Sequence, residues 1–228
     1  MRTIAATAIA VMLCGCAPTP TTPGKGAHLS AADEDLVAAR QEREAAEHRA
    51  SFDPGARERR EVCIHHGGGG SDADFYECWE SVVNPTESQL REARQHERVA
   101  DQRRANSQAL RFAEARACSG LSVADRDTSP FAHRGDIASV SPLPRGALVV
   151  FKRVPTLTAG HLQKIIDCHI ARNDALGHDV PEMGYCPLVP RDVTAKVISV
   201  QDGFAVTIES TDPKAAREVL ARAEALKP

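Results

Sequence analysis

The sequence predicts an α+β protein, with a helical region first and a small domain of strands and helices after it. Residues 30–118 are rich in Ala, Arg and Glu, which have high helix propensity. Residues 145–228 instead combine short continuous apolar runs, turn residues and helical apolar patterns. The chain has 228 residues, 42% hydrophobic and 4% aromatic, so one modest core is expected. Its formal charge of -3 disfavours nucleic acid as a partner.

The first expected helix begins at Ser30. Asp33 follows three residues later, which resembles a capping box with Asp in place of Glu, and the helix is expected to run to about Ala50. Its apolar content is nearly all alanine, so this helix buries little apolar surface by itself.

A helical hairpin is expected next. Asp53-Pro54 is an N-cap followed by Pro at the first helical position, and Gly67 to Gly70 then break the chain. Asp72 can cap a second short helix. That helix would carry the apolar residues Phe75, Tyr76, Trp79, Val82 and Val83.

A long charged helix should run from Asn84-Pro85 to Cys118, which is on the order of 45 Å for some thirty residues. Its sides are almost entirely charged from Glu87 to Asn106. This segment must therefore be solvated, packed against the first helix or paired with a partner, and its heptad pattern is too poor to establish a coiled coil. Residues 119–144 contain turn residues and three prolines, which predicts an irregular connector.

The small α+β domain is expected at residues 145–228. Its predicted order is strand, helix, strand, strand, helix, which is most of a ferredoxin-like unit without its last strand. We therefore expect a three-stranded sheet with two helices on one face. The expected strands are 146–154, 193–200 and 204–210. The expected helices begin after Thr158 and after Asp212-Pro213, and Asp202-Gly203 joins the last two strands as a hairpin turn.

The start of the chain has the layout of an export signal. Arg2 is followed by an apolar stretch from Ile4 to Leu13, about ten residues long, whereas a membrane-spanning helix needs about twenty. The stretch ends in Leu13-Cys14-Gly15-Cys16, which resembles the lipobox that signal peptidase II cleaves in bacterial lipoproteins. The alternative is an ordinary secretory signal with incidental cysteines.

The resemblance implies cleavage before Cys16 and lipidation of that cysteine. Residues 1–15 would then be the signal peptide, and residues 16–29, rich in Pro, Gly and Thr, the lipid anchor and a flexible linker. Ala17 after the cysteine favours the outer membrane, with the chain facing the periplasm. The carboxy-terminal stretch resembles only predicted lipoproteins without an assigned activity.

Five of the seven cysteines remain after cleavage and lipidation, and disulfides are the default in an exported protein. We expect one bridge between Cys63 and Cys78 across the glycine loop, worth about 3 kcal/mol for a loop of about fifteen residues. A second is expected between Cys168 and Cys186, which leaves Cys118 as a buried free thiol. A bridge from Cys118 to any of the others would contradict a domain boundary at the connector.

Two residue clusters could bind metal. Cys168, His169, His178, Met183 and Cys186 form a soft donor set that suits copper(I), or zinc without the Met. The alternative is the structural disulfide between the two cysteines of this set. The second cluster is Cys63-Ile64-His65-His66, whose alternative is a disulfide with two exposed histidines.

No catalytic signature stands out. Ser129 and His133 lie in one charged loop, but a Gly-flanked nucleophile turn is missing, which argues against a hydrolase. No Cys-x-x-Cys is present to support a thiol oxidoreductase. The expected function is therefore a non-catalytic binding or structural component of the cell envelope, which contacts the membrane through its lipid and binds another envelope protein. The alternative is a metal-handling lipoprotein that uses the donors of residues 168–186.

Overall fold

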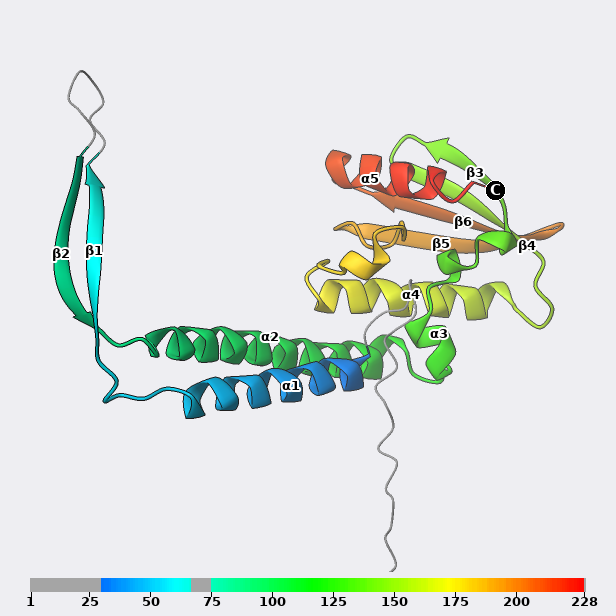
Figure 1. The fold of residues 1–228 in the computed structure, drawn as a ribbon. Coiled ribbons are helices and arrows are strands. Elements are labelled where there is room, and N and C mark those ends of the chain that lie inside the picture. The colour runs from blue at the N-terminus through cyan, green and yellow to red at the C-terminus, as the bar shows by residue number, and fades with distance from the viewer. Residues whose placement is uncertain (1–29, 67–74, 228) are drawn as a thin grey trace, which may run out of the picture.

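The computed structural model describes residues 30–66 and 75–227, and it confirms the mixed α+β class. Two long helices form an arm that carries a β-hairpin at its far end, and a compact α+β part lies at the other end (Figure 1). The expected signal peptide, Cys16, the linker and Gly67 to Gly70 lie outside the described residues.

In the arm the elements are α1 (Ala31–Ala50), β1 (Glu58–His66), β2 (Phe75–Val83) and α2 (Glu87–Ala117). The α+β part comprises α3 (Val123–Asp127), β3 (Ile137–Leu143), β4 (Gly146–Lys152), α4 (Ala159–Ala175), β5 (Val193–Val200), β6 (Gly203–Ser210) and α5 (Pro213–Glu224).

The arm is an antiparallel pair of helices, so the charged helix is packed against the first helix. Ser30 and Asp33 form the expected capping box at the start of α1. Small side chains fill the contact between the helices, which lets their backbones approach closely. The buried alanines of the two helices are Ala31, Ala38, Ala45, Ala93 and Ala100. Ion pairs such as Arg104 with Glu42 flank this narrow seam.

The hairpin at the end of the arm is built of strands, so the expected helical hairpin is wrong. Asp53 does not cap a helix: its Oδ1 accepts a hydrogen bond from the N–H of Gly55 at 2.7 Å, which makes a local turn. Strands β1 and β2 pair antiparallel with Cys63 opposite Cys78. The expected disulfide between these two cysteines is confirmed, but it joins two strands.

The sheet of the α+β part has four strands in the order β3-β4-β6-β5, all antiparallel, so the predicted three-stranded sheet is wrong. The expected strand, helix, strand, strand, helix order is present, and β6 lies between β4 and β5 as drawn in Figure 1. The additional strand β3 occupies the edge beside β4. The ferredoxin-like assignment therefore stays a prediction.

Strand β3 lies in the segment that was expected to be an irregular connector, and two features of its sequence conceal it. A register shift between Ile137 and Ser139 places the buried residues Ile137 and Val140 three positions apart, which hides the two-residue period of a strand. Pro142 looks like a strand breaker, yet it is tolerated because β3 is an edge strand. The same segment also contains α3 and two short 3-10 turns.

One hydrophobic core lies between the sheet and helices α4 and α5. Its members include Val149 and Phe151 of β4, Val206 of β6, Ile166 of α4 and Val219 of α5, all nearly or fully buried. The amino end of α5 is capped as expected, because Asp212 accepts hydrogen bonds from the first turn. The core holds α4 in place, and the arm attaches to the α+β part at α4.

The second disulfide joins Cys118 to Cys168, so the predicted bridge between Cys168 and Cys186 is wrong. The carboxyl end of α2 packs against α4, which places Cys118 beside Cys168 with Cα atoms 4.8 Å apart. Cys186 is instead a buried free thiol in the core, with its sulfur 3.3 Å from the Ser129 hydroxyl. The bridge crosses the expected boundary after residue 118 and joins the arm covalently to the α+β part.

Candidate functional site

The structure gives the five soft donors of residues 168–186 separate structural roles. The Cys168 sulfur is in the disulfide with Cys118. His169 is buried, its Nε2 lies 3.1 Å from the Asp125 carbonyl oxygen, and burial lowers the pKa of its imidazole to about 4. The ring is therefore neutral at physiological pH and holds α3 against α4.

The remaining three donors of this set are engaged in the loop after α4. His178 donates from Nδ1 to the Val189 carbonyl oxygen at 2.8 Å. Met183 is fully buried and accepts a contact from the Tyr185 hydroxyl at 3.4 Å. Burial raises the pKa of the Cys186 thiol to about 11, so it stays protonated. Within the described residues, the His and Cys members of this set form no metal-binding cluster.

The charged loop before β3, which contains Ser129 and His133, also has a structural role. Ser129 is buried, and its hydroxyl accepts the N–H of Phe131 at the start of a 3-10 turn. His133 is exposed at the end of that turn. The Ser129 hydroxyl thus contacts the Phe131 backbone and the neutral Cys186 thiol, and neither of these groups is a base that could activate it.

A buried guanidinium joins three elements next to the second disulfide. Arg172 of α4 is fully buried; its Nη1 donates to the Arg126 carbonyl oxygen and to Asp127 Oδ1 at 2.9 Å. Its Nε lies 3.4 Å from Glu114 Oε1 of α2. This cluster, Arg172 with Glu114, Asp127 and the Arg126 carbonyl, fixes the arm to the α+β part.

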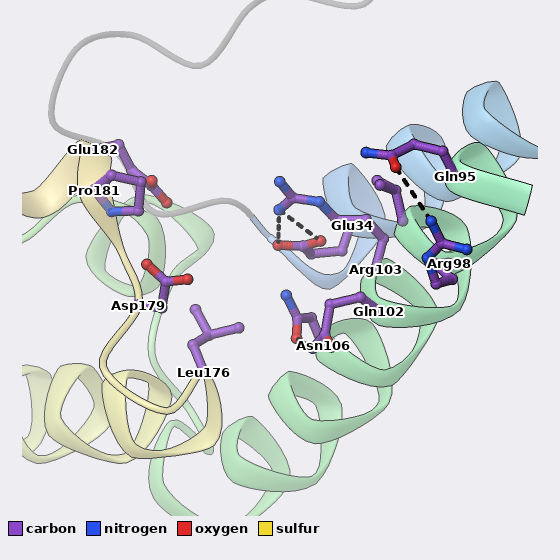
Figure 2. A pocket seen from close by; sticks show the side chains of 11 residues that line it. Glu34, Gln95, Arg98, Gln102, Arg103, Asn106, Leu176, Asp179, Pro181 and Glu182 are labelled. Atoms are coloured by element: carbon purple, nitrogen blue, oxygen red, sulfur yellow. Dashed lines mark hydrogen bonds and ion pairs between the residues drawn. The ribbon is translucent and has the colours of Figure 1, made fainter. Parts of the chain in front are cut away.

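A cleft of about 430 Å³ lies between α2 and the segment that follows α4 (Figure 2). On the arm side Arg103 Nη1 donates to both carboxylate oxygens of Glu34, at 3.1 and 3.2 Å. Burial raises the pKa of Glu34, and the ion pair with Arg103 opposes that shift. The opposite wall carries the carboxylates of Asp179 and Glu182.

The cleft is lined mainly by charged and amide side chains. Its carboxylates are those of Glu34, Asp179 and Glu182, and its guanidinium groups are those of Arg98 and Arg103. Both oxygens of the one buried carboxylate, Glu34, already accept hydrogen bonds from Arg103. The cleft is therefore a polar joint between the two parts of the molecule.

The hairpin offers a different kind of surface, because its apolar residues are exposed. Ile64 is 49% exposed and Trp79 is 43% exposed. The register pairs Val62 with Trp79, so these residues and Ile64 project from the same side of the hairpin, and Val83 follows further along it. We call this side the apolar face, after Val62, Ile64, Trp79 and Val83. It also carries Arg60, Glu77 and Ser81.

The opposite side of the hairpin carries the disulfide. Alternation along the strands places Glu61 and His65 on the same side as Cys63, and the register adds Glu80 and Tyr76 opposite them. We call this side the cysteine face. It carries Glu61, Cys63, His65, Tyr76, Cys78, Glu80 and the exposed Val82. The rings of His65 and Tyr76 are in contact, with centroids 4.8 Å apart.

The sequence contains a signal for these two faces. Val62 and Ile64 alternate with polar neighbours, which is the two-residue period of a strand, whereas the expected elements on both sides of the glycine segment are helices, with Trp79 on the second. Glu34 and Arg103 are 69 residues apart, and no local pattern indicates that they meet. Comparisons with protein-family models, curated proteins and solved structures found no match for this chain.

Proposed function

We propose that the mature chain is a lipid-anchored, periplasm-facing envelope protein that acts as a non-catalytic binding component. The observation that supports it is the position of the hairpin: an arm of paired helices holds it away from the core, with apolar side chains exposed (Figure 1). Exposed aromatic and aliphatic residues, such as Trp79 and Ile64 of the apolar face, are typical of protein interaction sites. The arm would hold this face at a fixed distance from the α+β part.

The occupant that fits the hairpin is an extended strand of another envelope protein. Cys63 and Cys78 have Cα atoms 4.1 Å apart, the spacing of a non-hydrogen-bonded pair, so their backbone N–H and C=O groups point to the outer edges. The same holds for Glu61 and Glu80, two residues away. Each edge therefore offers a row of backbone groups for strand addition, and the apolar face supplies side-chain contacts.

Site-specific crosslinking in cells tests this proposal. A photoreactive residue in place of Ile64, on the apolar face, should give one protein adduct of defined mass. The same residue in place of Val82, which is 62% exposed on the opposite side, is the matched control and should give none. Trp79→Ala should weaken the Ile64 adduct at least severalfold, because large aromatic residues dominate such interfaces. Equal adducts from both positions, or none from Ile64, would overturn the proposal.

Proline substitutions test whether the partner adds a strand to an edge of the hairpin. Glu61→Pro and Glu80→Pro each remove an N–H that points outward, so the bonds within the hairpin are kept. One of the two should abolish the Ile64 adduct and thereby identify the edge that binds. If neither changes it, the partner does not add a strand.

Anchoring is a separate part of the proposal and rests on the resemblance of Leu13-Cys14-Gly15-Cys16 to a lipobox. None of the described helices is long and apolar enough to cross a bilayer. Cys16→Ser should abolish incorporation of labelled fatty acid, because the lipid is attached through that sulfur, and should leave an unprocessed or released chain. Cys14→Ser is the control and should still be labelled. Label in the Cys16→Ser chain would contradict the assignment, and fractionation of the wild type tests the outer-membrane location.

A further inference from the structure

The cysteine face of the hairpin groups three metal-binding side chains. A carboxylate oxygen of Glu61 and the sulfurs of Cys63 and Cys78 all lie within 4.8 Å of one another, and all three residues are exposed. This is the one such group of His, Cys, Asp and Glu side chains in the described parts of the chain. The side chains of His65 and Glu80 belong to the same face.

While the disulfide is intact, its two sulfurs are bonded to each other and are not thiolate ligands. Reduction would convert them into the ligand type that zinc prefers in structural sites. Two thiolates on one tetrahedral zinc ion are about 3.8 Å apart, given Zn–S bonds of about 2.3 Å. The Cα atoms of Cys63 and Cys78 are already 4.1 Å apart, so rotation of the side chains can bring the sulfurs to this spacing without moving the strands.

We propose that the reduced hairpin binds one Zn²⁺ through Cys63, Cys78 and Glu61, with His65 as the fourth ligand. An external dithiol supplies the two electrons that cleave the S–S bond and becomes a disulfide itself. The two thiol protons are released when Zn²⁺ binds the thiolates. The same two sulfurs thus hold the strands together either through a covalent bond or through the metal.

The two disulfides differ in exposure, so a reductant should open one of them before the other. Cys63 and Cys78 are exposed, whereas Cys118 and Cys168 are buried. Thiol–disulfide exchange requires access of the attacking thiolate to a sulfur, so a reductant reaches the hairpin first. The hairpin needs some replacement for the lost bond, because an isolated pair of strands is only marginally stable.

Metal titration of the full chain carrying Cys16→Ser tests the proposal. The chain is first reduced mildly, and peptide mapping must show that only the Cys63–Cys78 bridge has opened. Zn²⁺ is then titrated against a chromophoric chelator. We expect one ion per reduced chain and none per oxidised chain, and Co²⁺ in place of Zn²⁺ should give the charge-transfer absorption of two thiolate ligands.

Matched variants assign the ligands. Cys63→Ser should abolish binding, and Cys186→Ser, which removes the buried free thiol of the described residues, should leave it unchanged. His65→Ala should weaken the affinity about tenfold or more, because even indirect partners of a metal ligand have effects of that size. His66→Ala, on the opposite side of the same strand, is its control and should have no effect. Absence of binding to the reduced chain, or binding that survives Cys63→Ser, overturns the proposal.

Discussion

Replacing both Cys118 and Cys168 with alanine is expected to lower the free energy of unfolding of the chain by about 4 kcal/mol. The bridge closes a loop of 50 residues, and the chain-entropy treatment of such a loop gives a value of this size. Both residues are buried and join α2 to α4, so the bond constrains how the arm meets the α+β part. Against a total stability of about 5 to 15 kcal/mol, this loss is large.

Urea denaturation of both forms, followed by far-UV circular dichroism, measures this difference. The double replacement of Cys63 and Cys78 with serine is the matched control. It removes a bridge that joins two exposed strands. The roughly 3 kcal/mol expected for a loop of this length should therefore be lost from local opening of the hairpin, and the main unfolding transition should stay within about 0.5 kcal/mol. Peptide mapping of the non-reduced wild type must show Cys118 linked to Cys168. A peptide linking Cys168 to Cys186 would contradict both the structure and the expected loss.

Local signals were sufficient for most helices and for one hairpin. The capping box at Ser30, the Asp212-Pro213 start of α5 and the Asp202-Gly203 turn all act within a few residues, so the chain shows them directly. Long helix α2 is confirmed for a similar reason, because no residue inside it breaks a helix. These elements can be predicted from the sequence without knowing what they pack against.

The errors arose where position in the fold overrides a local pattern. Pro142 looks like a breaker until β3 is known to lie at a sheet edge. Asp53 looks like a helix cap, and only the backbone of the following turn shows that it bonds to Gly55 instead. The pairing of Cys118 with Cys168 depends on α2 packing against α4, which sequence spacing does not reveal.

The candidate sites were predictable to different extents. Cys63 and Cys78 could be paired from the sequence because they flank one glycine-rich segment at a separation of 15 residues. Which residues share their side of the hairpin required the strand register, since the same residues on helices would point in other directions. Buried ion pairs such as Arg172 with Asp127 join residues 45 positions apart, and no motif indicated them.

The Arg172 cluster provides the second large effect. A buried charge is tolerated only when its partners remain, and here Arg172 faces the carboxylates of Glu114 and Asp127. Arg172→Met keeps much of the side-chain volume but removes the cation that both carboxylates face. Arg126 stays beside Glu114, with its Nη1 3.5 Å from Glu114 Oε2. Breaking such a pair from one side costs about 3 to 5 kcal/mol, far more than an exposed pair contributes.

Urea denaturation should therefore show Arg172→Met to be less stable than wild type by about 3 to 5 kcal/mol. Arg104→Met is the matched control, because Arg104 pairs with Glu42 and Asp35 at the surface of the arm, and its loss should cost less than about 1 kcal/mol. Adding Asp127→Asn to Arg172→Met should recover part of the loss, since it removes one of the uncompensated charges. If Arg172→Met costs no more than Arg104→Met, or if Asp127→Asn brings no recovery, the buried cluster does not fix the arm to the α+β part through its charges.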